Sequence, residues 1–396
     1  MAAALTRNFK EEVQMTSTET LEASRSVRSA ASLGLEPDAP VRARTHAIGA
    51  IGAGAIMADQ HLEAYRQAGF PVVAIASRTR ENAAAVAARY GIDTVHASPR
   101  ELILDPRIEI VDIAFPPDQQ PELIRLALAQ PHVRAVLAQK PLALSLDDAI
   151  ALRDEAAAAG KILSVNQNMR YDQSIRSLKQ LLDRGALGDP VFAAIDMHAV
   201  PHWQTFLAEY DRLTLANMSV HHLDALRYLF GEPVDIYTAG RPDPRTEFPH
   251  TDGIVASTLR FENGVLAVSR EDVWGGPRHE GFDSDFCISW RVEGTEGVAR
   301  GTIGWPDGAP STISFASARE TDGEWVTPEW ETHWFPHAFI GVMEQVQHAL
   351  DSGEPPALTV ADNVRTMALI EAGYRSLDER RAVRLDEFAL DPSQSH

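Results

Sequence analysis

The chain has 396 residues, with 36 lysines and arginines against 56 aspartates and glutamates, so its net charge is −20. This acidic balance argues against nucleic acid and anionic membrane surfaces as partners. The length favours two domains, and a hydrophobic fraction of 44% is enough for full-sized cores. The single cysteine, Cys287, excludes an intrachain disulfide framework. The sequence has no apolar run long enough to span a bilayer, and we therefore expect a soluble, cytoplasmic protein.

The N-terminal stretch differs in composition from the rest of the chain. Residues 1–40 are rich in Ala, Ser, Thr, Glu and Arg, and they show little apolar periodicity. They also lack the apolar core of a secretory signal. We predict that residues 1–44 form a disordered extension, and that a chain starting near Val41 keeps its melting temperature and its cofactor affinity.

A dinucleotide fingerprint follows the first predicted strand, at residues 45–52, and opens a helical stretch that ends near Ala68. Its first glycine permits a tight turn, and its second lets the backbone approach a pyrophosphate at a helix N-terminus. The third glycine, which serves helix–strand packing, is replaced by Met57. The residues of this turn that are predicted to bind a cofactor are Gly52, Gly54, Ala55 and Ile56.

The end of the second predicted strand, at residues 72–76, bears on the choice of cofactor. An NAD-specific site would offer an acid to the ribose hydroxyls at this point. The chain offers Ser77 and Arg78 instead. A hydroxyl and a guanidinium group suit a 2′-phosphate better, so we predict NADP as the preferred cofactor over NAD.

Strands and helices continue to alternate up to residue 165. Further apolar strands are predicted at residues 109–114, 134–137 and 161–165, with helices between them. Ser98 and Ser145 are predicted helix caps, and Gly160 is a predicted C-terminal stop. This alternation indicates an α/β fold with a parallel sheet and right-handed crossovers.

Lys140 lies at the carboxyl end of the strand predicted at residues 134–137. Ligands of open α/β sheets bind in the crevice outside the carboxyl ends of the strands. Pro141 follows the lysine and restricts its backbone. A lysine in this place is positioned to act on a ligand, although a surface Lys-Pro is common.

The second half of the chain has a different rhythm, with strands grouped from about residue 234 to 315 and helices on either side. Asn263 and Gly264 predict a hairpin with a two-residue turn. The grouping indicates an α+β domain with a large, open, mainly antiparallel sheet. Helices can cover one face of such a sheet, and self-association into a homodimer or homotetramer is the simplest cover for the other.

A helix predicted at residues 214–230 carries Asn217, His221 and Asp224 at spacings that place them on one face. His222 falls off that face. His221 is either a functional residue or an ordinary hydrogen-bonded core histidine. A metal site is disfavoured, because two adjacent histidines on a helix cannot both face one ion.

Seven motifs in chain order carry a resemblance to a known family: Ile51-Gly52-x-Gly54, Val111-Asp112-Ile113-Ala114-x-Pro116-Pro117, Lys140-Pro141-Leu142-Ala143, Asn166-Gln167-Asn168-x-Arg170-Tyr171, His221-x-x-Asp224-x-x-Arg227, Glu293-Gly294-Thr295-Glu296-Gly297 and Phe339-x-Gly341-x-Met343. From about His46 to Phe388 the chain resembles the Gfo/Idh/MocA oxidoreductases, a family that includes glucose–fructose oxidoreductase and inositol dehydrogenase.

The resemblance implies a Rossmann domain at residues 45–168 and a C-terminal domain at residues 169–390 for substrate binding and oligomerisation. It implies hydride transfer between NAD(P) and a sugar, sugar acid or cyclitol. Lys140 would hydrogen-bond the reacting oxygen, and His221 would be the general base or acid, supported by Asn217. The further residues implied to contact the cofactor are Pro116, Pro117, Gln120, Gln139, Lys140 and Asn168. The resemblance implies that Arg170, Tyr171 and His221 contact the substrate. Trp274 is added as a substrate residue from its polarity and loop position.

Three positions depart from the family pattern. The usual Glu of the Glu-Lys-Pro motif is Gln139, the usual Asp before the histidine is Asn217, and the usual His after the proline pair is Gln120. Without a carboxylate partner, His221 is predicted to be a weaker base. Asparagine can still orient the ring by hydrogen bonding.

These departures keep two alternatives open beside a dehydrogenase. One is an enzyme that holds its nucleotide and recycles it internally, such as an NAD-dependent glycoside hydrolase or isomerase. The other is a nucleotide-binding sensor without turnover. Further pocket candidates, chosen from polarity and loop position, are His198, His202, Trp203, Arg278 and His337.

Overall fold

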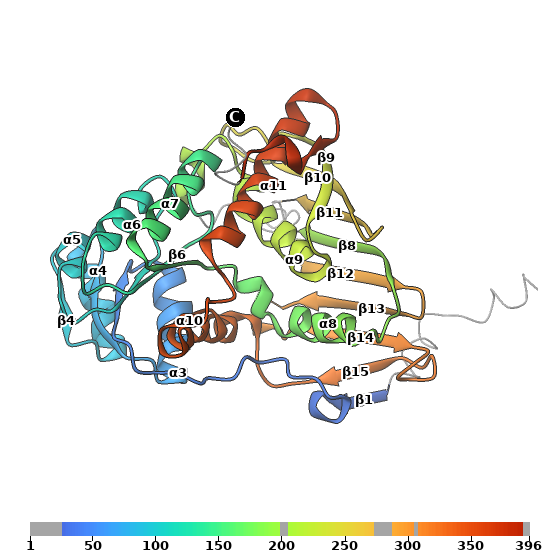
Figure 1. The fold of residues 1–396 in the computed structure, drawn as a ribbon, viewed down its shortest axis with the longest axis horizontal. Helices are drawn as coiled ribbons and strands as arrows, with labels where there is room; N and C mark the ends of the chain where they lie inside the picture. The colour runs from blue at the N-terminus through green and yellow to red at the C-terminus, as the bar shows by residue number, and fades with distance from the viewer. Residues whose placement is uncertain (1–25, 199–204, 273–286, 305–307, 391–396) are drawn as a thin grey trace, which may run out of the picture.

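The computed structural model describes residues 26–198, 205–272, 287–304 and 308–390. Two sheets form the framework of these ranges, a parallel sheet in the left half of Figure 1 and a larger mixed sheet in the right half. No helix of the described residues is both long and apolar enough to cross a membrane. The predicted combination of a parallel sheet and a large, mainly antiparallel sheet is confirmed.

The parallel sheet has the strand order β4-β3-β2-β5-β6-β7. Its strands are β2 (Ile48–Ile51), β3 (Val72–Ala76), β4 (Thr94–Val95), β5 (Ile110–Ile113), β6 (Ala135–Ala138) and β7 (Ile162–Val165). The chain starts in the middle, at β2, and runs outward in both directions. The strand order therefore reverses between β2 and β5, which is where doubly wound sheets bind their ligands. The two-residue strand β4 was not predicted, because so short a segment shows no periodicity.

Helices alternate with these strands as the sequence predicted. They are the π-helix η2 (Ile56–His61), α3 (Leu62–Ala68), α4 (Arg80–Tyr90), α5 (Pro99–Ile103), α6 (Gln120–Leu128) and α7 (Leu146–Ala159). Ser98 Oγ accepts the main-chain N–H of Glu101, and Ser145 Oγ accepts that of Asp148. Gly160 ends α7 with a φ of 63°. The predicted caps and stop are confirmed.

The larger sheet has the strand order β1-β15-β14-β13-β12-β8-β11-β10-β9-β16. Adjacent strands are antiparallel except for the pairs β1·β15 and β8·β11, which are parallel. Its strands are β1 (Ser26–Ser29), β8 (Pro190–His198), β9 (Pro233–Arg241), β10 (Ile254–Phe261), β11 (Leu266–Asp272), β12 (Cys287–Gly294), β13 (Gly297–Ile303), β14 (Thr312–Ser317), β15 (Val326–Glu329) and β16 (Val383–Arg384). Short helical turns lie at η5 (Thr205–Glu209) and η9 (Leu385–Glu387).

Three helices pack on one face of this sheet: α8 (Gln173–Asp183), α9 (Val220–Phe230) and α11 (Val360–Glu379) (Figure 1). Leu178 of α8 and Leu223 of α9 are fully buried in one core with strand residues such as Val292. The helix predicted at residues 214–230 starts with a π-helix, η6 (Leu215–Ser219), before it continues as α9.

The hairpin between β10 and β11 differs from its prediction in the length of its turn. The main-chain N–H of Gly264 bonds to the carbonyl of Phe261, and the N–H of Phe261 bonds to the carbonyl of Val265. Three residues, 262–264, therefore form the loop instead of two. Gly264 has a φ of 89°, which the third position of such a loop requires.

One helix of the second half returns to the parallel sheet. In α10 (Trp334–Ser352), Phe339, Val342 and Val346 are buried in a core with Ile48 of β2 and Ile75 of β3. Figure 1 shows α10 beside α3. The predicted boundary near residue 168 separates the strands of the two sheets, but the core of the first sheet is completed by residues that follow the second.

The described part of the N-terminal extension is ordered, which corrects the prediction for residues 26–44. β1 pairs in parallel with β15, and a short turn, η1 (Ala30–Leu33), follows it. Leu35 is 2% exposed and lies in the core of the large sheet. Arg42 forms a bidentate pair with Glu344 of α10 at 2.9 and 3.0 Å. Polar composition hid these anchors, because each depends on a contact with a residue far along the chain.

Candidate active site

Lys140 connects the two halves of the molecule. It follows the carboxyl end of β6, and its Nζ donates a 2.7 Å hydrogen bond to the main-chain carbonyl of Asn217 in η6. Burial lowers the pKa of Lys140 to about 7. An ammonium group taken out of water loses its proton more readily. Lys140 therefore changes its protonation state near neutral pH, as a proton-transfer group requires.

His221 lies in the first turn of α9 and is 5% exposed. Burial lowers its pKa well below the usual value, and positive charge on Lys140 and His222 lowers it further. Its Nδ1 has no hydrogen-bond partner among the described residues. The edge of the Trp334 indole packs against the imidazole ring, with the ring centres 6.1 Å apart. His221 is thus a neutral imidazole near enough to Lys140 for the two side chains to influence each other electrostatically.

The helix face predicted to carry Asn217, His221 and Asp224 is divided in the structure. Asn217 belongs to the π-helix, and its main-chain carbonyl accepts the Lys140 hydrogen bond. Asp224 faces away from this contact, toward Arg170 and Thr366. The extra residue of the π-turn changes the angular spacing between positions 217 and 224, which regular helix geometry could not anticipate.

Arg170 is held in a buried ionic network. Its guanidinium group donates to both carboxylate oxygens of Asp224 at 2.6 Å and to Asp362 at 2.5 Å. Arg227 joins the same network through Asp362 and Thr366. The guanidinium group predicted to approach the substrate is instead engaged by two carboxylates. We interpret Arg170 as a residue that fixes α9 and α11 behind the site.

Asn168 and Tyr171 flank this network in the short helix η3 (Asn168–Tyr171). Asn168 Oδ1 accepts a 3.1 Å hydrogen bond from the indole nitrogen of Trp334, which also borders His221. Tyr171 packs so closely on Gly341 that a Cβ there would lie 2.2 Å from its ring. Sequence reasoning missed Trp334, since an aromatic residue at a helix start carries no specific signal.

The loop that carries Lys140 is fixed by Gln120, which is fully buried at the start of α6. Its Nε2 lies 2.7–2.8 Å from the carbonyl oxygens of Gln139, Pro141 and Leu142. Its Oε1 accepts the main-chain N–H of Gln139 at 3.2 Å. The amide predicted to contact the cofactor is therefore occupied by the main chain of this loop.

The glycine turn that follows β2, at the carboxyl edge of the parallel sheet, has the backbone features that a dinucleotide needs. Gly52 has a φ of 125°, and a Cβ there would lie 2.7 Å from the carbonyl oxygen of Ala114. Gly54 faces open space, so its backbone can be approached by a ligand. Met57 is fully buried at the position of the missing third glycine, within the wider π-turn η2.

The residues predicted to bind the ribose phosphate, Ser77 and Arg78, follow the neighbouring strand β3. Ser77 follows β3, and its Oγ is 3.4 Å from the main-chain N–H of Thr79. The exposed guanidinium group of Arg78 lies 5.8 Å above the ring of Phe115. Pro116 follows Phe115 in the chain, and its carbonyl oxygen accepts the main-chain N–H groups of Gln119 and Gln120 at the start of α6. Pro117, the residue after it, is buried. Arg78, after β3, and the glycine turn, after β2, therefore lie at the same carboxyl edge of the parallel sheet.

Comparison with known proteins gives the same interpretation. Residues 46–167 match the description "Oxidoreductase family, NAD-binding Rossmann fold", and residues 175–300 match "GFO/IDH/MocA C-terminal domain". The chain belongs to the Gfo/Idh/MocA oxidoreductase family. The resemblance inferred from the seven motifs is confirmed.

Two curated relatives of this Gfo/Idh/MocA chain illustrate its similarity to named enzymes. D-Apiose dehydrogenase of Paraburkholderia graminis is 27% identical over 86% of this chain and 90% of its own. Myo-inositol 2-dehydrogenase of Thermotoga maritima is 28% identical over 76% of this chain and 86% of its own. An oxidoreductase from Agrobacterium radiobacter, solved with NAD+, L-tartaric acid and magnesium, has a TM-score of 0.74 at 23% identity, covers 86% of this chain and 99% of its own, and shows the same fold.

Not every predicted pocket residue can be placed in this Gfo/Idh/MocA site. His202, Trp203, Trp274 and Arg278 lie outside the described residues. His198 contacts Arg270 and Asp196 at the end of β8, on the sheet face opposite the helices. His337 accepts the main-chain N–H of His333 at the start of α10.

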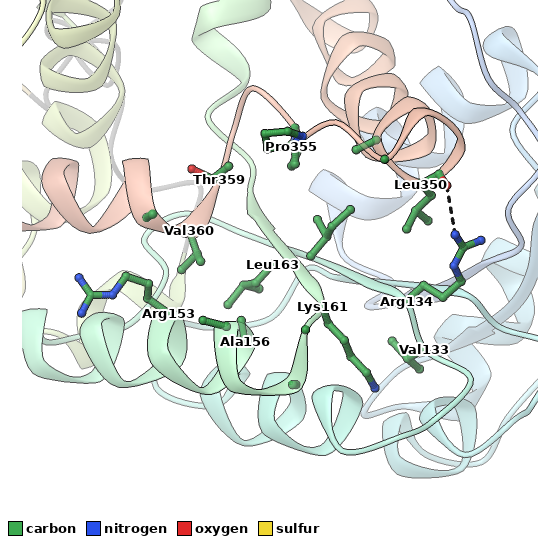
Figure 2. Close-up of a pocket in the computed structure, with 18 of the residues that line it drawn as sticks. Val133, Arg134, Arg153, Ala156, Lys161, Leu163, Leu350, Pro355, Thr359 and Val360 are labelled. Atoms are coloured by element: carbon green, nitrogen blue, oxygen red, sulfur yellow. Dashed lines mark hydrogen bonds between the residues drawn. The ribbon is translucent and has the colours of Figure 1, made fainter. Parts of the chain in front are cut away.

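A separate hollow of about 660 Å³ lies elsewhere on the parallel sheet (Figure 2). Val133 and Lys161, which line it, precede β6 and β7, so it lies at the amino-terminal edge of these strands. Arg134 at its wall donates a 3.1 Å hydrogen bond to the carbonyl of Leu350. Lys140 follows the opposite end of β6, and the hollow is therefore distinct from the candidate active site.

Proposed function

We propose that this protein is an NAD(P)-dependent oxidoreductase that transfers hydride between a nicotinamide cofactor and a hydroxyl or carbonyl group of a sugar, sugar acid or cyclitol. The observation that supports this most directly is the pairing of a lysine that titrates near neutrality with a buried neutral histidine at the carboxyl edge of the parallel sheet. The names of the relatives, D-apiose dehydrogenase and myo-inositol 2-dehydrogenase, support a carbohydrate or cyclitol substrate.

We assign the cofactor to the carboxyl edge of the parallel sheet at β2, where Gly52 and Gly54 let the backbone approach a pyrophosphate. The family match supports a nicotinamide dinucleotide. We propose NADP as the preferred form, because Arg78 can offer a charge-assisted contact to a 2′-phosphate. When bound, the nicotinamide ring supplies the hydride acceptor or donor.

In the oxidation direction, the substrate hydroxyl must lose its proton as the carbon loses hydride. We propose that Lys140, in its neutral form, accepts this proton, since its pKa of about 7 matches the working range. The pKa of His221 is too low for this residue to hold the proton at neutral pH, so its neutral ring is better suited to orient the hydroxyl by hydrogen bonding. This exchanges the roles that the family resemblance implied.

The proposed function can be tested by screening polyols, aldoses, sugar acids and cyclitols with NAD and NADP. Each cofactor is used in its oxidised and in its reduced form. We expect a substrate-dependent change of absorbance at the reduced nicotinamide band, lost in Lys140→Met. Protein that purifies with bound nucleotide and shows no net change would indicate internal recycling. A protein that binds the cofactor but turns over none of the compounds would favour a sensor and contradict the proposal.

A further inference from the structure

A buried histidine is connected to the main chain of Lys140 through Gln139. His61, at the end of η2, is 1% exposed, and its Nδ1 is 2.8 Å from Oδ2 of Asp112. The hydroxyl group of Tyr65 donates to the same oxygen at 2.7 Å. Asp112 lies within the apolar strand β5 and is fully buried. A carboxylate in this position requires strong hydrogen bonds to offset its desolvation.

The other nitrogen of His61 faces two side-chain amides. The amide nitrogen of Asn166 lies 3.0 Å from Nε2, and that of Gln139 lies 3.4 Å from it. The far end of Gln139 fixes its orientation, because its Oε1 accepts the main-chain N–H of Lys140 at 3.0 Å. Amide N–H groups only donate, so Nε2 must accept. In this arrangement the Nε2 atom of His61 faces donors and its Nδ1 atom faces an acceptor, Asp112.

We propose that His61 is a positioning residue, held neutral by Gln139 and Asn166, that ties the main chain of Lys140 to the buried carboxylate of Asp112. The titratable groups that face His61 are Asp112 from β5 and Tyr65 from α3. From α10, the apolar ring of Phe339 covers it at 4.7 Å between ring centres. The consequence for catalysis rests on the proposed function of Lys140, whereas the charge state of His61 does not.

Gln139 decides this charge state. In Gln139→Glu, one carboxylate oxygen can still accept the N–H of Lys140, but the other would face the lone pair of His61 Nε2. Two acceptors cannot share a hydrogen bond unless one gains a proton. We therefore expect His61 to become an imidazolium between two carboxylates in this variant. A neutral amide at position 139 and a neutral His61 form a matched pair.

The charge state can be measured by ¹⁵N NMR on the full chain labelled with ¹⁵N-histidine, without ligand, at pH 8. His61→Asn, or His61→Gln if the first does not fold, assigns the signal. We expect the neutral Nδ1–H form in the wild type and the imidazolium in Gln139→Glu. An imidazolium or an Nε2–H form in the wild type would overturn the proposal, as would an unchanged His61 in Gln139→Glu. This readout is independent of turnover, so it stands even if the proposed function fails.

The positioning role is tested by kinetics with the substrate found in the screen. We expect His61→Asn to lower kcat about tenfold or more through misplacement of Lys140, and to leave the Kd of the reduced cofactor unchanged. We expect Gln139→Glu to add an ionisation to the pH profile of kcat that the wild type lacks. The control is His96→Asn, because His96 also pairs with a carboxylate of this domain, Asp105, at 3.1 Å. An equal loss of kcat in His61→Asn and in the control would show that the role of His61 is only structural.

Discussion

Lys140 and His221 can both carry a proton, but their surroundings give them different protonation states. Desolvation brings the pKa of Lys140 to about 7 and drives that of His221 far lower. At neutral pH only the lysine exchanges a proton readily. Burial therefore determines which residue carries the proton, and burial cannot be read from a sequence motif.

This difference predicts the pH dependence of turnover. Below pH 7 Lys140 is protonated and can donate, and above pH 7 it is neutral and can accept. We expect kcat for oxidation to rise with pH through a midpoint near 7, and kcat for reduction to fall through the same midpoint. Both are measured from pH 5.5 to 9 with saturating cofactor.

The variants separate the two candidate residues. Lys140→Met should lower kcat about a hundredfold and abolish the midpoint, because it removes the proton carrier. His221→Asn should lower kcat but keep the midpoint. A midpoint that persists in Lys140→Met and disappears in His221→Asn would return the proton transfer to His221.

Arg78 allows a second prediction at the level of one residue. Its exposed guanidinium group at the carboxyl edge of the parallel sheet should favour NADP over NAD, and Arg78→Ala should weaken NADP binding by about 1.5–3 kcal/mol while changing NAD little. Fluorescence titration with each reduced cofactor measures both affinities. Arg100→Ala, an exposed arginine of α5, is the control. Equal affinities in the wild type would contradict the assignment.

At the level of elements, residues 26–40 form a strap that the sequence did not reveal. β1 adds an edge to the large sheet, Leu35 enters its core, and Asp38 accepts hydrogen bonds from Gln173 and Thr332. We expect a chain that starts at Val41 to lose at least about 2 kcal/mol of unfolding free energy, because burying one leucine contributes this much.

A chain that starts at Ser26 is the matched control for this truncation, since the two differ only in the strap. Chemical denaturation followed by circular dichroism gives both free energies. Leu35→Ala should reproduce much of the loss. Equal stability of the two chains would restore the prediction that the whole extension is dispensable.

The elements that the sequence predicted well are those defined by local pattern. Strands β3, β5 and β7, the caps Ser98 and Ser145, and the helix that became α9 follow from apolar runs and cap residues. The three-residue hairpin loop at 262–264 and the π-helix η6 were missed. Both depend on a single extra residue, and the energy that places it comes from tertiary contacts.

The candidate site divides in the same way. Sequence motifs drew attention to Lys140, His221 and the glycine turn, because these positions follow strand ends or helix faces. They did not anticipate the protein partners of Arg170 and Gln120, whose polar groups bond to Asp224 and to main-chain carbonyls. They also missed His61, because its partners come from four separate segments. A polar residue in a buried strand, Asp112, was the signal that could have found it.

At the level of the whole molecule, the large sheet has two faces of different character. In register, Ile236, Leu259, Ala267, Ala193 and Val292 form one row, and each is buried under the helices. The adjacent row, on the other face, is Tyr237, Thr258, Val268, Ala194 and Arg291, and each is partly or fully exposed. Near its centre, Leu266 pairs with Phe192 on this second face.

This second face leads to a prediction about assembly. Large apolar side chains are exposed on this face, with Leu266 of β11 42% exposed beside Phe192 and Val268, and Tyr237 of β9 44% exposed nearer the sheet edge. Ion pairs such as Arg291–Glu293 lie around them. A sheet face that exposes large apolar side chains among charged ones is typical of an interface, and a second copy of the same sheet is its simplest cover. We expect a homodimer or homotetramer joined through this face, seen by light scattering at micromolar concentration as at least twice the chain mass.

The interface can be located with one charge at its centre. Val268→Arg places an unpaired guanidinium group among Ala194, Leu266 and Phe192, and an uncompensated buried charge at an interface costs several kcal/mol. We expect this variant to be a folded monomer with an unchanged circular dichroism spectrum. Leu144→Arg is the control, because Leu144 is 49% exposed in the parallel-sheet half, and it should keep the wild-type mass. A monomeric wild type, or a Val268→Arg variant of unchanged mass, would show that this face is not where the copies meet.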